Sequence, residues 1–269
     1  MPSEIDGVPT DVIQTGVIRA FQEPTGRFRP APGGVSVGHK DITAGTLGCW
    51  VKRDGQWMIL SNNHVLANVN EASIGDAILQ PGTHDGGVNP DDQIATLEDF
   101  VPIELGGLPS DCNIAGGLVS LLNAIAKALD SNTRIQAVRA QAEGNTVDAA
   151  IARPLKEEDV KAEILHIGAI TGVAAAELGM ALKKSGRTTG YTEGTVQQVD
   201  VTVNVNYGAG RTVMFTDQIV ASPMGKPGDS GSAILDDQNR LVGLLFAGSD
   251  DSTIFNKIYN VFSKLNLTL

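Results

Sequence analysis

The segment GKPGDSGSAIL, Gly225 to Leu235, places one serine, Ser230, between two glycines, directly after Asp229 and just before an apolar run. Asp, Ser and Gly are the residues that tight turns prefer, so the segment is typical of a turn that enters a β-strand. A serine on such a turn can also be a nucleophile, provided that a base accepts its proton and a third group orients the base. The interpretation of Ser230 therefore depends on its partners.

A base for Ser230 would have to be one of the four histidines, His39, His64, His84 or His166. His64 lies in SNNHVLA, where the apolar strand at 57–60 ends and a short turn begins. Loops that follow a rigid strand are places where side chains are presented to a cleft. His84 lies at a loop tip, in GTHDGG. His64 is therefore the candidate base.

An orienting acid is indicated by Asp148, in NTVDAAIARP, because apolar residues flank it on both sides. A carboxylate in this setting is expected to enter the core, where an unpaired charge is costly. An imidazole N–H would supply the partner, as the acid of a catalytic triad requires. A salt bridge to Arg153, or a cap on a following turn, is the alternative.

Most of the chain has the pattern of short β-strands separated by turns. TLGCWVKRDGQWMILSNN (46–63) predicts a hairpin with its turn at 53–55, and SAILDDQNRLVGLLF (232–246) predicts another about 236–239. VQQVDVTVNVNY (196–207) alternates valine with polar residues, the period of a strand with one solvated face. Several strands at this spacing favour a barrel or a sandwich.

Two amphipathic helices are expected, one over 114–129 and one at the C-terminus about Ile258 to Leu265. Each has an apolar face that should be buried, and we expect the first to pack against the same chain, as a wall of the cleft. Leu118, Leu122, Ile125 and Leu129 form that face. The segment 1–40 is interpreted as an extended N-terminal arm.

Composition excludes several functions. The formal net charge of −11 would repel a nucleic-acid backbone or an anionic membrane, and the apolar run at 114–129 is too short to span a bilayer. The N-terminus lacks the pattern of a signal peptide, and two cysteines, Cys49 and Cys112, cannot form a disulfide framework, which favours a reducing, cytoplasmic location. No cofactor motif occurs, and the paired aspartates 91–92, 236–237 and 250–251 lack EF-hand spacing, so we expect neither cofactor nor metal.

The chain order His64, Asp148, Ser230 is that of chymotrypsin, and Ser232 breaks the G-x-S-x-G elbow of the α/β-hydrolases. The chain resembles the trypsin-like, chymotrypsin-fold serine peptidases. SNNHVLA resembles their histidine motif, VDAAIA their aspartate strand and GDSGSAIL their nucleophile loop, and GRTTGYTEGTV and GLLFAG resemble flanking strands. The resemblance covers roughly residues 44–100 and 145–269.

This resemblance implies a mostly β fold of two six-stranded antiparallel barrels, with a helical insertion and a C-terminal helix. The expected division is an arm at 1–40, a first barrel at 41–155 with the insertion about 101–140, and a second barrel with the C-terminal helix at 156–269. The long interval between His64 and Asp148 contains the insertion. The disulfides of secreted members are absent, and no zymogen cleavage site is evident, so the partner of Asp229 stays open.

The resemblance also implies a serine endopeptidase acting on proteins or peptides. Ser230 would attack the carbonyl, His64 would take its proton, Asp148 would stabilise the imidazolium, and the N–H groups of Gly228 and Ser230 would hold the oxyanion. The alternative is a catalytically restrained domain that serves as a binding or scaffold module. The oligomeric state is open.

The same resemblance implies a substrate pocket that carries no charge at its base. Met224 stands six residues before Ser230, where trypsin-type members place an aspartate. Phe246 and Gly248 would lie on one wall and Thr253 on the other. We therefore expect apolar residues of medium size before the cut, unless Asp250 or Asp251 points inward and supplies a charge for Lys or Arg.

Overall fold

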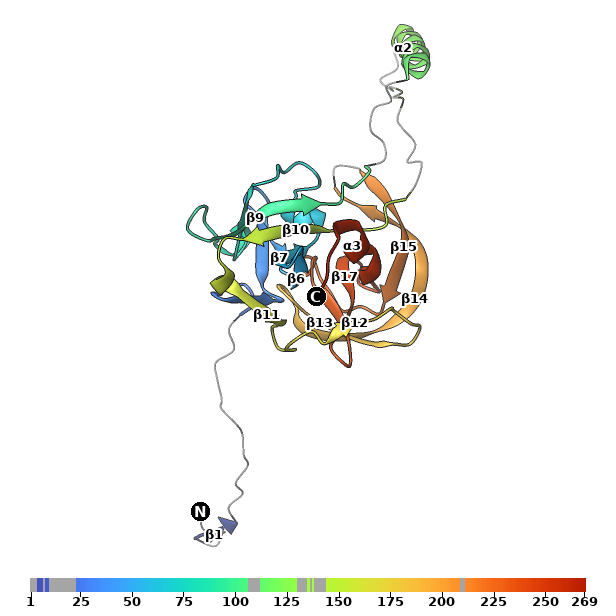
Figure 1. The fold of residues 1–269 in the computed structure, drawn as a ribbon. Coiled ribbons are helices and arrows are strands. Elements are labelled where there is room, and N and C mark those ends of the chain that lie inside the picture. The colour runs from blue at the N-terminus through green and yellow to red at the C-terminus, as the bar shows by residue number, and fades with distance from the viewer. Residues whose placement is uncertain are drawn as a thin grey trace.

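A computed structural model describes residues 4–6, 8–9, 23–105, 112–129, 135, 137, 144–208 and 211–269. Two mainly antiparallel sheets of seven strands make up most of this part of the chain and lie side by side in Figure 1. The mostly β class and the two-barrel arrangement expected from the sequence are confirmed. Two short pairs lie outside the sheets, β1 (Glu4–Ile5) with β2 (Val8–Pro9), and β3 (Ala31–Gly33) with β11 (Val160–Ile164).

The first sheet has the strand order β5-β4-β8-β9-β10-β7-β6. The predicted hairpin at 46–63 forms its edge, because Arg53 pairs with Gln56 and Cys49 with Leu60. β10 then pairs with β7, and this register places Asp148 close to the end of β7 that precedes His64. The strands are β4 (Ser36–His39), β5 (Gly45–Thr46), β6 (Cys49–Arg53), β7 (Gln56–Ser61), β8 (Ala77–Leu79), β9 (Gln93–Phe100) and β10 (Ala150–Pro154).

The second sheet has the order β12-β17-β16-β13-β14-β15-β18, and a further pairing of β17 with β18 closes six of its strands into a ring. β12, two residues long, adds to the outer side of β17 as the seventh strand. The strands are β12 (Gly172–Val173), β13 (Ala181–Gly186), β14 (Gly190–Asn206), β15 (Thr212–Ala221), β16 (Ala233–Asp236), β17 (Arg240–Gly248) and β18 (Thr253–Lys257). In the first sheet the two-residue β5 is likewise added to β4, which accounts for seven strands where six were expected.

The first sheet begins earlier than the boundary at residue 40 that the sequence suggested. β4 pairs with β8 inside the sheet, and the indole N–H of Trp50 donates to the carbonyl of Ala31 at 2.7 Å. The segment 31–39 is rich in glycine and proline and too short to show an alternating pattern, so its strands are fixed by these contacts with distant residues. The part of the expected arm at 10–22 lies outside the described residues.

The C-terminal helix α3 (Ile258–Leu265) fills the junction between the two sheets. Its buried residues Ile258, Val261 and Leu265 share one apolar cluster with Met58 and Leu60 of β7, and with residues of β16 and β17. Burial of this face explains why the amphipathic pattern at the C-terminus predicted a docked helix. Each sheet also has a core of its own.

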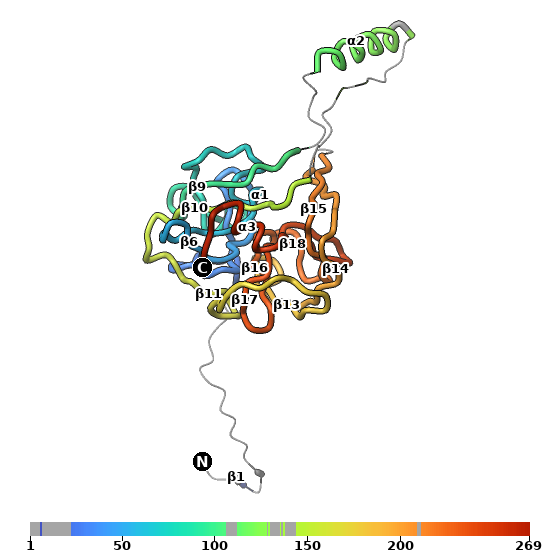
Figure 2. Tube along the Cα trace, turned by 45° about the vertical axis from the view of Figure 1, so that its right-hand side comes forward, coloured from blue at the N-terminus to red at the C-terminus, as the bar shows by residue number. Residues whose placement is uncertain are grey.

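The predicted insertion helix exists as α2 (Asn113–Ala128), but its apolar face is not buried in this chain. Ile114 is 85% exposed and Leu118 57% exposed, and the helix stands apart from both sheets in Figures 1 and 2. Our expectation that it packs as a wall of the cleft is wrong for this structure. An amphipathic pattern reports that a face is apolar, and it does not say what covers that face. No helix among the described residues is long and apolar enough to cross a membrane.

Candidate active site

His64 and Asp148 meet at the end of the first sheet. His64 lies on the short helix α1 (Asn63–Leu66), which follows β7 directly, and Asp148 precedes β10, the neighbour of β7. The Nδ1 atom of His64 lies 2.5 Å from Oδ2 of Asp148, and the backbone N–H of His64 donates to Oδ1 at 3.3 Å. The Asp148 side chain is fully buried, and the His64 ring is its hydrogen-bond partner. Arg153, the alternative partner, is bonded to Glu98 instead.

Tyr207, at the end of β14, also donates to Asp148. Its hydroxyl lies 2.6 Å from Oδ2, the oxygen that contacts His64. Burial, reinforced by the Asp148 charge, raises the pKa of Tyr207 well above its usual value. Sequence analysis did not single out this residue, although it continues the alternation of Val201, Val203 and Val205 by one more step.

Buried amides fix the backbone on both sides of the Asp148 side chain. Asn62 donates to the Asp148 carbonyl at 2.7 Å, and the Asp148 N–H donates to the side-chain oxygen of Asn256 at 3.0 Å. Asn256 in turn donates to Gln218 at 2.7 Å. All three amide side chains are fully buried and come from β15, β18 and the residue before α1. The second barrel therefore holds an acid that belongs to the first.

Ser230 lies on the loop before β16 and is joined to the first barrel through its carbonyl, which accepts the Thr46 N–H at 2.8 Å. A Cβ atom on Gly45 would approach Val65 to 2.5 Å and the Ser230 carbonyl to 3.0 Å. Glycine at this position thus lets α1, which carries His64, and the loop that carries Ser230 approach from two sides. Among the described residues, no hydrogen bond joins the His64 ring to Ser230.

The two N–H groups proposed for the oxyanion, those of Gly228 and Ser230, donate to no other group within the described parts of the chain. Gly228 has φ +97°, which side chains with a Cβ rarely adopt, and a Cβ there would collide with Thr188. Its carbonyl accepts the Thr46 hydroxyl at 3.0 Å, which fixes the direction of the peptide. The glycine is thus required by the conformation of the loop.

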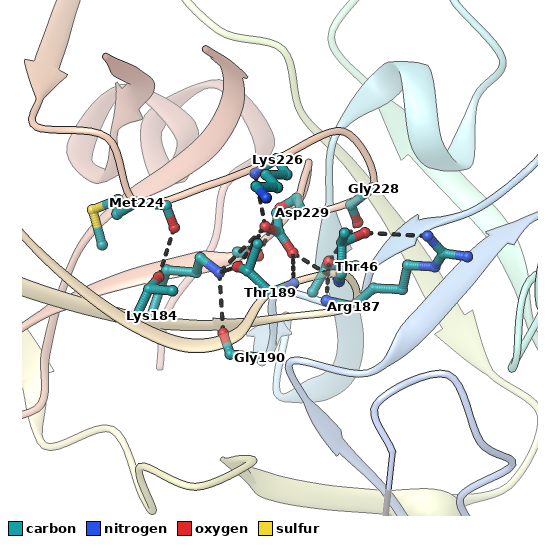
Figure 3. A network of polar contacts seen from close by, with 12 residues as sticks. Thr46, Lys184, Arg187, Thr189, Gly190, Met224, Lys226, Gly228 and Asp229 are labelled. Atoms are coloured by element: carbon teal, nitrogen blue, oxygen red, sulfur yellow. Dashed lines mark hydrogen bonds and ion pairs between the residues drawn. The ribbon is translucent and has the colours of Figure 1, made fainter. Parts of the chain in front are cut away.

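Asp229 has a partner that the sequence left open. Its carboxylate accepts the Thr188 N–H at 2.8 Å and the Thr189 hydroxyl at 2.7 Å, and it forms an ion pair with Lys184, Nζ to Oδ2 3.4 Å (Figure 3). Burial lowers the pKa of Lys184, and Asp229 opposes this effect. A signal for Lys184 existed: in ALKKSG it shares the inward face of β13 with Leu182.

Arg187, which follows β13, connects the second barrel to the first. Its guanidinium forms a two-point ion pair with Asp85, and its backbone N–H donates to the Thr46 hydroxyl at 3.0 Å. The Thr46 hydroxyl is the same group that donates to Gly228, as Figure 3 shows. Thr46 therefore links residues that flank Ser230 to both barrels.

A pocket of about 540 Å³ opens beside Ser230. Phe246, Gly248 and Thr253 line it, as the sequence suggested, together with Lys226 and Asp250. Met224 is not among its lining residues, because its side chain points into the core of the second barrel. The remaining lining residues are Val205, Asn206, Gly225, Pro227, Leu245, Ala247 and Ser249.

This architecture is the chymotrypsin fold of serine proteases. Solved structures with the same fold include the Nocardiopsis protease NAPase (18% identity, TM-score 0.55, covering 88% of this chain and 97% of that one). Thermobifida fusca Protease A is 18% identical, with a TM-score of 0.56, and the match covers 88% of this chain and 97% of that one. A serine protease described as glutamic acid specific is 19% identical, with a TM-score of 0.55, and the match covers 89% of this chain and 100% of that one. No protein-family model and no curated protein matches the chain.

Proposed function

We propose that the protein is a serine endopeptidase that cleaves proteins or peptides through an acyl-enzyme. The observation that carries the proposal is the contact between His64 Nδ1 and the fully buried Asp148, at 2.5 Å. It is supported by the approach of Val65 of α1 and the Ser230 carbonyl to Gly45 from two sides. A buried acid that orients an imidazole beside a serine on a glycine-rich loop is the arrangement that activates a serine nucleophile.

In this mechanism Ser230 Oγ attacks the carbonyl carbon of the scissile peptide while His64 Nε2 accepts the hydroxyl proton. Asp148 keeps the other ring nitrogen protonated and stabilises the imidazolium that forms. The free N–H groups of Gly228 and Ser230 stabilise the oxyanion of the tetrahedral intermediate. His64 then protonates the leaving amine, and water attacks the acyl-enzyme in a second cycle with His64 again as the base.

A second candidate is a binding or scaffold module that retains these residues without turnover. It is favoured by one observation: within the described residues, the His64 ring and Ser230 share no hydrogen bond. In proteins without a bound substrate, catalytic hydrogen bonds are often long and shorten only in the substrate complex. We therefore keep the peptidase as the main proposal.

Labelling with a fluorophosphonate probe tests the proposal, because the reaction requires an activated serine and an accessible oxyanion site. We expect one label per chain, located on Ser230 by peptide mass mapping and lost in Ser230→Ala. Ser73→Ala, which changes an exposed serine, should label like the wild type. If correctly folded protein takes up no label, the binding module replaces the peptidase, and label without cleavage in a broad peptide library would restrict the activity to esters or to the chain itself.

A further inference from the structure

Tyr207 lies far from Asp148 in sequence, at the tip of the hairpin formed by β14 and β15. Its backbone N–H donates to the carbonyl of Arg211 at 2.9 Å across that tip. The ring stacks on Phe215 of β15, with centroids 6.0 Å apart and an angle of 18° between planes. The position of the phenol is therefore set by the hairpin and by the apolar cluster beneath it.

The contacts of the Asp148 carboxylate come from two residues in the described parts of the chain. Oδ1 accepts the backbone N–H of His64, and Oδ2 accepts both the His64 ring at 2.5 Å and the Tyr207 hydroxyl at 2.6 Å. The rings of Tyr207 and His64 meet edge to face, with centroids 6.0 Å apart. Among the residues that the structure describes, Tyr207 is thus the one donor to this buried carboxylate other than His64.

We infer that Tyr207 is a positioning residue of the active site: its hydroxyl fixes the Asp148 carboxylate and thereby the orientation of the His64 ring. A carboxylate that rotates about its Cβ–Cγ bond would change the direction of the hydrogen bond to Nδ1, and the second donor prevents this rotation. The inference rests on the proposed function for its effect on turnover, although the contact itself exists independently of activity.

The phenol can play this part at neutral pH. Because burial and the Asp148 charge raise its pKa well above 10, Tyr207 stays protonated and remains a donor. The titratable side chains for which the described structure gives a contact with Tyr207 are Asp148 and His64.

The residues on either side of the insertion, Glu104 and Asn145, are bonded to the hairpin that carries Tyr207 or to each other. Asn145 donates its backbone N–H to Met214 at 3.0 Å and accepts the Thr216 N–H at 2.8 Å, so it pairs with β15. Its side chain exchanges hydrogen bonds with the backbone of Glu104 at 2.8 and 3.1 Å. The two chain segments that enter and leave the insertion are therefore joined to each other and to the strand opposite Tyr207.

Steady-state kinetics of Tyr207→Phe test the role in turnover, because this change removes one oxygen and keeps the stacked ring. We expect kcat to fall about 10-fold, the effect of losing one hydrogen bond to a charged group. KM should change little, since Tyr207 does not line the substrate pocket. The acid limb of kcat/KM should move to higher pH, because a carboxylate with one donor fewer favours a charged partner more strongly.

Tyr191→Phe is the matched control. Tyr191 lies at the opposite end of the same strand, where its hydroxyl donates to Glu193 at 2.6 Å, and the variant should keep wild-type kinetics. A Tyr207→Phe protein with wild-type kcat and an unmoved acid limb would overturn the inference. So would a loss in which KM rises and the acid limb stays in place, because that pattern marks a substrate contact.

A measurement without substrate separates this inference from the proposed function. Tyrosine ionisation followed by ultraviolet absorbance should show one group, absent in Tyr207→Phe, that titrates well above pH 10, and in Asp148→Asn this group should titrate at lower pH. An unchanged titration in Asp148→Asn overturns the inference even in an active enzyme. If the wild type neither labels nor cleaves, the proposed function fails, while a shifted titration still shows that Tyr207 holds Asp148.

Discussion

Lys184 and Asp229 form an ion pair in which neither side chain is exposed to solvent, with Nζ 3.4 Å from Oδ2. Lys184 also donates to Gly190 at 3.0 Å and to the Thr189 hydroxyl. The Asp229 side chain is therefore held by groups of the second barrel, whereas Thr46 of the first barrel holds the carbonyls of Gly228 and Ser230. Asp229 accepts no hydrogen bond from the first barrel within the described residues, so a cation in the strand itself organises the loop.

Replacing Lys184 with methionine should destabilise the protein and abolish labelling of Ser230. The variant fills a similar volume but leaves the Asp229 carboxylate buried without a cation, and breaking a buried pair in this way costs about 3–5 kcal/mol. Denaturant unfolding gives the free energy, and fluorophosphonate uptake by the folded fraction gives the state of the loop.

Lys183→Met is the control, because Lys183 lies next to it on β13 and bonds the exposed Asp237 carbonyl at 3.1 Å. It should change stability by less than about 0.5 kcal/mol. A stable Lys184→Met protein that labels at the wild-type rate would show that the pair does not organise the loop.

Asp148→Asn should lower kcat about 10⁴-fold, because an amide favours the wrong tautomer of the His64 ring. Peptide hydrolysis measured on the purified variant checks this value. Asp99→Asn serves as the comparison, since Asp99 bonds Arg53 at 2.7 Å outside the site and should leave kcat unchanged. Full activity of Asp148→Asn, with loss in Asp99→Asn, would mean that the wrong acid has been assigned.

Local patterns in the sequence predicted much of this architecture. The hairpin at 46–63 and the strand before His64 were predictable because alternation and a turn lie within a few residues of one another. The same holds for Asp148, whose apolar neighbours in sequence are its neighbours on β10. These features depend on the local periodicity of apolar residues, which can be read from the sequence alone.

Contacts between distant segments were not predictable in the same way. Tyr207 and Lys184 meet their partners only after the second barrel closes, and the exposed face of α2 looks identical in sequence to a docked one. Met224 aligns with a pocket residue, yet the direction of its side chain depends on packing against the core. Tyr207 and Lys184 nevertheless left a signal in the sequence, because each is a polar residue at a position where the alternation of its strand predicts an apolar one.

The ion pair between Asp85 and Arg187 should make stability depend on acid pH. Burial opposes ionisation of Asp85, but Arg187 and the Ser36 hydroxyl outweigh it and lower the pKa of this carboxyl. A group with a lowered folded pKa stabilises the protein above its unfolded value, 3.8, and the benefit disappears as pH falls through the folded pKa.

Asp85→Asn should therefore lower the free energy of unfolding by about 2 kcal/mol at pH 7, and the difference from wild type should shrink below pH 4. Urea unfolding at a series of pH values measures it, with the exposed Asp237→Asn as a control. A difference that stays constant down to pH 2 would contradict the assignment.

The two cysteines should differ in reactivity. Cys49 is buried in the apolar cluster beneath α3, and burial raises its pKa to about 12, so its thiolate is scarce at neutral pH. Cys112 is exposed. A disulfide reagent at pH 8 should therefore modify Cys112 in the native protein and reach Cys49 only after unfolding, as mass mapping would show. Modification of Cys49 at the same rate would require an opening of this cluster.

Substrate preference is the property that the pocket beside Ser230 should determine. Phe246 and Leu245 give the pocket apolar walls. Thr253 narrows it; this side chain is buried, and its hydroxyl accepts the Met224 N–H at 2.9 Å. Lys226 and Asp250 also line it, but both residues are exposed, so water screens their charges and each offsets the other. A medium-sized apolar side chain gains most from such a site, whereas a buried cation would lack a dehydrated counter-ion.

We therefore expect cleavage after Leu, Val, Ala or Met in a peptide library that varies the residue before the cut. Asp250→Ala should leave this preference unchanged, because the Asp250 carboxylate is exposed. Asp251→Ala is the control for Asp250→Ala, because Asp251 is not among the residues that line the pocket. Dominant cleavage after Arg or Lys that disappears in Asp250→Ala but persists in Asp251→Ala would mean that Asp250 turns inward with substrate bound. Dominant cleavage after Glu that disappears in Lys226→Met would assign the corresponding role to Lys226, and either result would replace the apolar pocket with a charged one.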